Sequence, residues 1–442
     1  MGLLLGIDLG TSYFKVALFT PEGTMRGLGR VRVETTSPAP GRVELEAATF
    51  WLLLRRGLAE ALAQAGASPS EISGVAYSSQ ATTFLLLDAR DQPLTPLVLW
   101  TDTRGAPIED AVDGVARRPE FAAAVGHRGL VAESAVPKLR WFQRVAPDLW
   151  KRTARVMTVS DYFTFALTGE RAGDASTAAF LGLYHLGERR WWPEAMAAFG
   201  LDPARFSTPL RPGSPCGRTR GAADELLGLP AGVPCAVGAI DHHAAAIGSG
   251  LGRLAEISIS TGTVLAALAI VDRVEPADGC YHGPHVDGVR FYRLAFDPNG
   301  AGQLEVYQRR EAPGLSIEQL LELAARAPAG GGIPGDHGGA VRGLLERVAV
   351  SHRELVRRVT GGQAPARVIA TGGGARSPLW LQIDADILNA TIVRPASPER
   401  ACLGAAAFAA VAAGYYSSVD GATAAMVRPD REFAPAGRGG RA

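Results

Sequence analysis

Two glycine-containing turns, far apart in the chain, carry the residues best suited to phosphate chemistry. The first reads Gly-Ile-Asp-Leu-Gly-Thr-Ser at residues 6–12, and the second reads Ile-Ser-Thr-Gly-Thr at residues 259–263. Short apolar runs flank both turns, a pattern that predicts β-hairpins with a glycine bend. Gly10 and Gly262 let the backbone present N–H groups to an anion at close range. The hydroxyl groups that add donors belong to Thr11, Ser12 and Thr263. Two such turns predict two similar halves that bind one nucleotide.

A carboxylate and a lysine accompany the first turn. Asp8 lies at its mouth, where it could hold the hydrated magnesium ion that accompanies nucleotide phosphates, and Lys15 offers a point charge. The alternative is a structural hairpin with an incidental aspartate. A single Gly-Thr turn would favour that alternative, whereas a second turn after a matching strand favours phosphate binding.

Another acidic residue ends an apolar strand in the middle of the chain. Residues 237–241 read Val-Gly-Ala-Ile-Asp and are followed by His242 and His243. A general base in phosphoryl transfer must be fixed close to the nucleophile, and a strand end meets this need. Asp241 is therefore the candidate base, although spacing alone equally allows a helix N-cap. The adjacent histidines would point about 100° apart on a helix, which disfavours a shared zinc ion, so we interpret them as polar lining of a cleft.

A triple glycine follows a third strand-like run. Residues 368–375 read Val-Ile-Ala-Thr-Gly-Gly-Gly-Ala, and a helix is expected to begin within residues 377–380. A nucleotide base or ribose lying against the glycine backbone would explain three glycines in a row, with the helix N-terminus near the phosphates. An ordinary strand-to-helix connection needs only one glycine, so the pattern favours a ligand.

Composition narrows the class of function. The chain has 442 residues, 47% of them hydrophobic, which suits a folded protein of two or three domains. Lys plus Arg total 45 against 44 for Asp plus Glu, so no net field favours nucleic acid or an anionic membrane as a partner. The cysteines lack metal-ligand spacing and form no disulfide framework, which predicts a reducing cytoplasm. The balanced charge leaves small ligands as the expected partners. Because the sequence shows no signal peptide core or membrane span, the protein is expected to be neither secreted nor embedded in a membrane.

Strand-like runs alternate with helical patterns, which predicts an α/β architecture with helices layered on sheets. Apolar residues at helical spacing predict a helix over residues 50–65 that ends at Gly66, and a strand is expected at residues 74–77. Pro137 is expected to open a helix over residues 138–150.

Further signals mark a helix start, a boundary and two loops. Ser316 and Gln319 form a capping box ahead of an apolar run. A glycine-rich passage places a domain boundary within residues 245–255. Residues 327–339 are expected to form a loop, and residues 435–442 a frayed tail.

In their order and spacing, these motifs resemble those of the FGGY family of carbohydrate kinases. The resemblance also includes Ser78-Ser79-Gln80 ahead of residues 84–88, Leu99-Trp100-Thr101-Asp102-Thr103-Arg104, Pro137-Lys138-Leu139-Arg140-Trp141, Asp161-Tyr162 and Leu167-Thr168-Gly169-Glu170. It covers nearly the whole chain. It implies two actin-like, ribonuclease-H-like α/β domains that flank a nucleotide and sugar cleft. Residues 1–248 would form the sugar-binding domain, residues 249–434 the nucleotide-binding domain, and residues 435–442 a flexible tail.

The resemblance implies an ATP-dependent kinase that transfers the γ-phosphoryl group to a hydroxyl of a small ketose or polyol, most similar to the xylulose kinases. Asp241 would be the catalytic base, and Asp8 and Asp241 would hold Mg²⁺. The residues implied for the nucleotide are Asp8, Gly10, Thr11, Ser12, Lys15, Thr261, Gly262, Thr263, Gly373 and Gly374. The residues implied for the sugar are Gln80, Thr82, Trp100, Asp102, Arg104 and His242, beside Asp241.

Two departures from the family pattern leave the substrate open. Ala81-Thr82 stands where xylulose kinases carry Met-His and glycerol kinases carry Arg-Glu, and residues 323–343 lack a Gly-Glu-Arg-Thr-Pro-like motif. Alternatives are a kinase for another sugar such as ribulose or glycerol, a catalytically impaired sensor of nucleotide or sugar, and a partner-moving ATPase. The expected partners are a small sugar and ATP, and a homodimer is left open.

Overall fold

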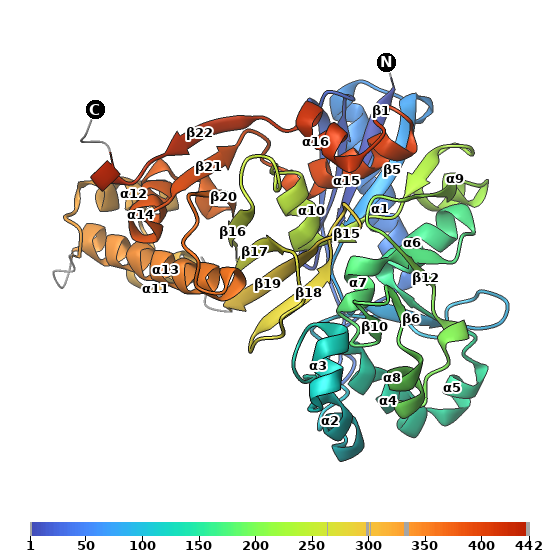
Figure 1. Ribbon diagram of the computed structural model, residues 1–442. Coiled ribbons are helices and arrows are strands. Elements are labelled where there is room, and N and C mark those ends of the chain that lie inside the picture. Colours follow the sequence, from blue (N-terminus) through green and yellow to red (C-terminus); the bar gives the residue numbers. More distant parts are fainter. Residues whose placement is uncertain (1, 263, 298–299, 301, 331–335, 439–442) are drawn as a thin grey trace. The chain divides into compact units, whose positions relative to one another are not determined.

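The computed structural model describes residues 2–438 except 263, 298–299, 301 and 331–335 (Figure 1). Contacts divide the chain into two compact units, each described by itself. Unit 1 comprises Met1–Gly248, Asp272–Tyr292 and Glu399–Met426, and unit 2 comprises Ser249–Val271, Arg293–Pro398 and Val427–Ala442. Unit 1 therefore includes two segments that come late in the chain. None of the described helices combines the length and apolar character needed to cross a membrane.

Unit 1 is built on a sheet with the strand order β13-β14-β5-β1-β2-β3, and β15 pairs with β5 beside this path. The strands are β1 (Leu3–Leu9), β2 (Tyr13–Phe19), β3 (Met25–Arg32), β5 (Ile72–Ser79), β13 (Pro215–Arg218), β14 (Pro234–Ala236) and β15 (Ala239–Ile240). The β1–β2 and β2–β3 pairs are antiparallel, as predicted for the first hairpin. β5 runs parallel to β1, β14 and β15.

Helices cover both faces of this sheet. α1 (Ala47–Ala65) packs on β2 and β3, whereas α15 (Arg400–Ala412) packs on β1 and β5 (Figure 1). A side chain at Gly29 would collide with the backbone of α1, and one at Gly6 with the backbone of α15. Gly6 pairs with Ala17 and Gly29 pairs with the preceding residue, Val16, so side chains at Gly6 and Gly29 would point to opposite faces of the sheet. The prediction for α1 is confirmed, since it ends at Gly66 with a φ of 62°.

A smaller sheet with the order β4-β7-β6-β8 and its helices form the rest of the N-terminal part of unit 1. Its strands are β4 (Glu44–Leu45), β6 (Phe84–Leu87), β7 (Leu97–Val98) and β8 (Arg155–Thr158), and the nearby helices are α2 (Asp110–Ala116), α3 (Pro119–Val125), α4 (Ala135–Val145), α5 (Pro147–Arg152) and α6 (Val159–Thr168). The single helix predicted over residues 138–150 is wrong. α4 begins at Ala135, and Ala146 leaves the helical conformation (φ −130°, ψ 56°) because the residue before a proline is disfavoured there.

Short elements complete unit 1. They are η1 (Pro69–Glu71), β9 (Ala172–Asp174), α7 (Ala175–Ala179), β10 (Tyr184–His185), β11 (Arg190–Trp191), α8 (Pro193–Ala198), η2 (Pro203–Arg205), β12 (Thr208–Leu210), α9 (Ala222–Leu227), α10 (Asp241–Ile247), β18 (Cys280–Pro284) and α16 (Val419–Met426). α10 packs against α15, which joins the middle of the chain to its C-terminal part.

Unit 2 repeats the strand order of unit 1. Its strands are β16 (Ile257–Thr261), β17 (Leu265–Val271), β19 (Phe291–Asp297), β20 (Arg367–Gly372), β21 (Thr391–Pro395) and β22 (Pro429–Phe433), in the order β19-β17-β16-β20-β21-β22. β16 and β17 form the second predicted hairpin, and β20 and β21 run parallel to β16. Here β19-β17-β16-β20-β21 corresponds to β3-β2-β1-β5-β14, so the recurrence of the Gly-Thr turn reflects a repeated fold.

The helices of unit 2 follow local signals. They are α11 (Gly302–Glu311), α12 (Ile317–Arg326), α13 (His337–Thr360) and α14 (Pro378–Leu388), with η3 (Gly374–Arg376) and η4 (Ala436–Arg438). The capping box is confirmed, because the backbone N–H of Gln319 donates to Ser316 Oγ at 3.2 Å and that of Ser316 to Gln319 Oε1 at 2.8 Å. The loop predicted over residues 327–339 extends too far, since α13 begins at His337. Residues 331–335 and 439–442 lie outside the described residues.

Candidate active site

The carboxyl ends of three strands meet at one edge of the unit 1 sheet. In the register of the sheet Asp8 lies opposite Ser78, and Ser78 lies opposite Ala239 of the parallel strand β15. Asp241 follows β15 directly, as the first residue of α10. Because the three strands are parallel, the two candidate carboxylates come from the same edge, on either side of β5.

Asp8 is buried, with 7% of its surface exposed. Its Oδ1 accepts a hydrogen bond from Ser78 Oγ at 3.0 Å, and its Oδ2 lies 3.5 Å from Lys15 Nζ. The pKa of Asp8 is raised overall, mainly because the carboxylate is buried. The charge of Lys15 lowers this pKa, whereas the charge of Asp241 raises it. The site thus holds two carboxylates close enough to repel each other, and Lys15 of β2, opposite Asp8 in the sheet, partly offsets the charge of Asp8.

Lys15 has a second acidic partner that sequence reasoning missed. Its Nζ lies 3.2 Å from Oε2 of Glu399, the N-cap residue of α15. Burial lowers the pKa of Lys15, but the charges of Asp8 and Glu399 outweigh this effect and raise it overall. The sequence offers no local signal for this pair, because Lys15 and Glu399 lie at opposite ends of the chain.

Asp241 is half-buried at the start of α10. Its Oδ1 accepts a hydrogen bond from the backbone N–H of His242 at 2.7 Å. The alternative of a helix N-cap is wrong, because Ile240 is the N-cap and makes no side-chain capping bond. His243 does not line a cleft either: it is fully buried, with its Nε2 at 3.1 Å from Nδ1 of His285.

The position of α10 is fixed by direct backbone packing. A side chain added at Gly404 of α15 would collide with the carbonyl oxygen of Ala244, and one at Gly248 would collide with that of Arg400. The two helices therefore approach each other as closely as glycine allows. This contact holds Asp241 on a rigid support.

The first Gly-Thr turn contacts the predicted sugar-binding residues. Trp100 Nε1 donates to Thr11 Oγ1 at 2.7 Å, and Gln80 Nε2 lies 3.5 Å from the carbonyl oxygen of Gly10. Ser12 at the tip of the turn is exposed. The structure thus brings residues predicted for phosphate and residues predicted for sugar to one place in unit 1.

Asp102 and Arg104 form an internal cluster. Asp102 Oδ1 accepts from the backbone N–H and from Nε of Arg104, both at 2.9 Å, and Oδ2 accepts from Arg104 Nη2 and from the backbone N–H of Val43, both at 2.8 Å. Arg104 Nη2 also pairs with Glu44 Oε1. Burial alone would raise the pKa of Asp102, but the hydrogen bonds from Arg104 lower it overall. These two side chains therefore hold the loop after β7, and their polar atoms are largely satisfied by protein partners.

Unit 2 brings its own predicted residues together. β16 and β20 are parallel, and Thr261 lies opposite Gly372 at their carboxyl ends. A Cβ at Gly372, which has a φ of 84°, would lie 2.5 Å from the Thr261 carbonyl oxygen, and one at Gly374 would lie 2.5 Å from Thr261 Cγ2. Gly262 and Gly373 follow these strand ends, whereas Thr263 lies outside the described residues. The glycines of the turn after β20 therefore let its backbone pack directly against Thr261.

The donor set at the unit 1 edge suits a magnesium ion that arrives with nucleotide. No group of three or more His, Cys, Asp or Glu side chains forms a metal site among the described residues. Magnesium commonly uses only one or two carboxylates, together with water and phosphate oxygens. Asp8 and Asp241 supply two carboxylates of this kind.

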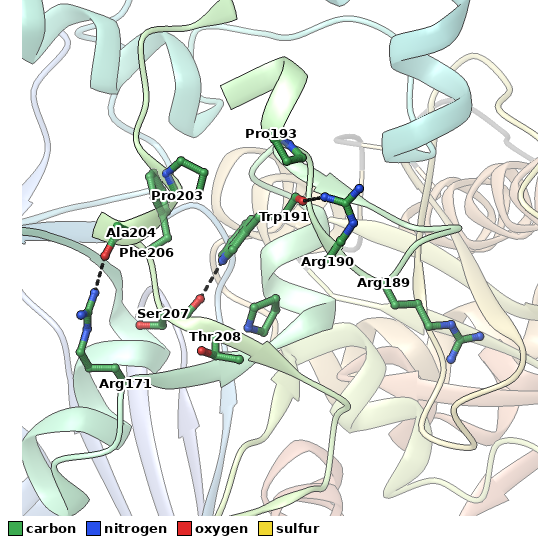
Figure 2. A pocket seen from close by; sticks show the side chains of 11 residues that line it. Arg171, Arg189, Arg190, Trp191, Pro193, Pro203, Ala204, Phe206, Ser207 and Thr208 are labelled. Atoms are coloured by element: carbon green, nitrogen blue, oxygen red, sulfur yellow. Dashed lines mark hydrogen bonds between the residues drawn. The ribbon is translucent and has the colours of Figure 1, made fainter. Parts of the chain in front are cut away.

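A separate hollow of about 670 Å³ in unit 1 is lined by none of the predicted site residues. Arg171, Arg189, Arg190 and Trp191 lie on its walls (Figure 2). Arg171 Nη2 donates to the carbonyl oxygen of Ala204 at 2.7 Å, and the three arginine side chains spread in different directions. Because their charged groups do not converge, the hollow is not a formed anion site.

Two family models match the chain. The model of the N-terminal domain of the FGGY family of carbohydrate kinases matches residues 3–248, and the model of the C-terminal domain matches residues 209–413.

Similar proteins match over nearly the whole of this chain. The L-xylulose/3-keto-L-gulonate kinase of Escherichia coli is 26% identical, over 98% of this chain and 92% of the relative. The xylulose kinase of Bacillus subtilis is 25% identical, over 98% of this chain and 93% of the relative. Among solved structures, the xylulose kinase from Rhodospirillum rubrum has a TM-score of 0.86 and 26% identity, over 98% of this chain and 94% of that chain. The predicted fold, with two actin-like α/β domains, is confirmed.

Proposed function

The chain belongs to the FGGY family of carbohydrate kinases and is an ATP-dependent sugar kinase, and from this premise we propose that it phosphorylates a hydroxyl of a small ketose with Asp241 as the general base. The assignment of Asp241 as the base rests on its position at the same edge of the unit 1 sheet as Asp8. Asp241 is half-buried there, on a helix fixed by backbone packing, near the buried carboxylate of Asp8.

Asp241 accepts the proton of the sugar hydroxyl as its oxygen attacks the γ-phosphorus of ATP. The new oxygen–phosphorus bond forms while the bond from the γ-phosphorus to the β,γ-bridging oxygen breaks, and ADP leaves. Lys15, Thr11 and the backbone of Gly10 lie at the same strand edge, where they would stabilise the charge on the phosphoryl oxygens. Chemistry of this kind depends mainly on position and electrostatics.

Magnesium would be held by Asp8 and Asp241 through oxygen ligands and would neutralise part of the phosphate charge. Lys15 shares its charge between Asp8 and Glu399. This arrangement keeps Lys15 ordered beside Asp8, so that it is in place to meet a phosphate. Thr261, Gly262, Gly373 and Gly374 of unit 2 would contact the nucleotide.

A ketose is the acceptor class that we favour, because relatives named for xylulose or for L-xylulose and 3-keto-L-gulonate match over nearly the whole chain. Gln80, Thr82, Trp100 and His242 would bind its hydroxyl groups. Asp102 and Arg104 would act on the sugar indirectly, by holding the loop that carries Trp100.

The test is ADP formation measured across ketopentoses, ketohexoses, aldoses and polyols. We expect ADP to form with a subset of ketoses and to be almost lost in Asp241→Asn, whereas the exposed Asp224→Asn on α9 serves as the matched control and keeps full activity. ADP formation that needs no sugar, or that survives Asp241→Asn, would overturn the proposal.

A further inference from the structure

We propose that Lys138, a buried lysine on α4, is a positioning residue that joins the two segments assigned to the acceptor and thereby sets the affinity for the sugar. The first segment, residues 80–83, follows β5, and the second, residues 99–104, follows β7. The inference rests on the proposed function, since that assigns both segments to sugar binding.

Lys138 makes direct bonds to both segments. Its side chain has no exposed surface, and Nζ donates to the carbonyl oxygen of Thr82 at 3.1 Å and to that of Leu99 at 2.9 Å. Thr82 has a φ of 53°, in the left-handed region that a β-branched residue rarely adopts. A bond to its carbonyl oxygen helps to hold the segment in this unusual conformation.

The segments are also linked to each other and to the first Gly-Thr turn. The backbone N–H of Trp100 donates to Thr83 Oγ1 at 2.9 Å, and Thr83 Oγ1 donates to Gln80 Oε1 at 3.0 Å. Trp100 Nε1 in turn donates to Thr11 Oγ1. Lys138 therefore anchors a continuous set of hydrogen bonds that ends at three predicted ligand-binding side chains.

Burying this lysine is costly, which argues that its donors are needed. In the described part of the chain Lys138 forms no ion pair. Asp102 and Glu133 attract its charge without a hydrogen bond to it, and Arg104 repels it. The ring of Phe84 lies 5.6 Å from Nζ and offers only a weak cation–π contact. A methionine would fill a similar volume without the cost of a buried charge. What methionine lacks is the ability to donate to two carbonyl groups at once.

Lys138→Met tests the proposal through steady-state kinetics with D-xylulose, or with the best acceptor of the panel. Loss of two buried hydrogen bonds is expected to raise the acceptor KM about 10- to 100-fold. The ATP KM is expected to change less than about twofold, because Lys138 bonds directly to the two acceptor segments, whereas Asp8 and Lys15 pair with each other and Thr11 is reached only through Trp100.

The matched control is Leu139→Ala, the next residue of α4. Leu139 is buried in the core of this region but bonds to neither segment, so its truncation costs stability by leaving a cavity. The acceptor KM of Leu139→Ala is expected to stay within about threefold of the wild-type value. An unchanged acceptor KM in Lys138→Met, or an equal rise in both variants, would overturn the proposal.

Hydrogen exchange on the ligand-free protein separates this inference from the proposed function, because it needs no turnover. Peptides that cover residues 80–83 and 99–104 are expected to exchange faster in Lys138→Met than in Leu139→Ala. If Lys138→Met does not fold, Lys138→Gln replaces it, since its shorter side chain retains an amide donor for one carbonyl. The positioning role is refuted if the folded variant and the wild type show the same exchange rates in both segments. This outcome holds even if no sugar is phosphorylated.

Discussion

Replacing Lys138 with methionine is expected to change how the stability of unit 1 depends on pH. Burial lowers the pKa of Lys138 from its ordinary value of 10.5 to about 7. Below pH 7 the lysine is charged in both the folded and the unfolded chain, so folding carries the full cost of burying the charge. Above pH 7 the folded protein releases this proton while the unfolded chain keeps it.

The sign and size of the effect follow from this difference. Between pH 7 and 10.5 the unfolded chain binds more protons than the folded protein, so the free energy of unfolding rises with pH. The slope is at most about 1.4 kcal/mol per pH unit, which gives about 3 kcal/mol over two pH units. The Lys138→Met variant lacks this term. The neutral amine keeps two donor hydrogens, so the bonds to Thr82 and Leu99 are retained across this range.

Urea unfolding of the two proteins, compared from about pH 6 to about pH 9, measures the difference. Tryptophan fluorescence suits the assay because six of the seven tryptophans lie in unit 1. Lys151→Met, which removes an exposed lysine of α5, is the control for the loss of one lysine. A difference between wild type and Lys138→Met that stays constant from about pH 7 to about pH 9 would refute the argument about the buried charge.

Three further predictions concern the strand edges. Asp241→Asn is expected to lower kcat about 10²- to 10⁴-fold while calorimetry shows that ATP still binds. Ser78→Ala removes a hydrogen bond that lowers the pKa of Asp8, so the acidic limb of the kcat/KM profile should move to higher pH. Gly372→Ala is expected to destabilise the protein by about 1–3 kcal/mol in thermal unfolding and to raise the ATP KM, because the new Cβ would lie 2.5 Å from the Thr261 carbonyl oxygen at a φ of 84°.

Each of these predictions has an outcome that contradicts it. Loss of ATP binding in Asp241→Asn would point to nucleotide binding as the main role of that carboxylate. An acidic limb that stays in place in Ser78→Ala would show that Asp8 does not govern it. Wild-type stability in Gly372→Ala would mean that the β20 turn can move away from Thr261, and the exposed Gly437→Ala offers a control for the glycine-to-alanine change itself.

Features that depend on neighbouring residues could be predicted from the sequence. Gly66 ends α1 in the left-handed conformation, and Ser316 with Gln319 caps α12, because a glycine or a capping box acts within a few residues. The two hairpins were predictable for the same reason. The helix over residues 138–150 was not, since the effect of Pro147 on Ala146 outweighs helical periodicity.

Features that depend on distant contacts could not be predicted in this way. Glu399 reaches Lys15 only because the C-terminal part of the chain returns to unit 1. The complete burial of Lys138 is not predictable from the sequence, since lysine is almost never fully buried. His243 likewise pairs with His285, and nothing near it in the sequence indicates that partner.

The close approach of α10 and α15 has a consequence for protein engineering. No methyl group can be added at Gly248 or Gly404 without displacing a helix, so this region offers little room for mutation. Residues 81 and 82 take no part in that helix pair, because they lie in the acceptor segment after β5. Libraries that aim to change which sugar is used should therefore randomise these two positions and leave the glycines untouched.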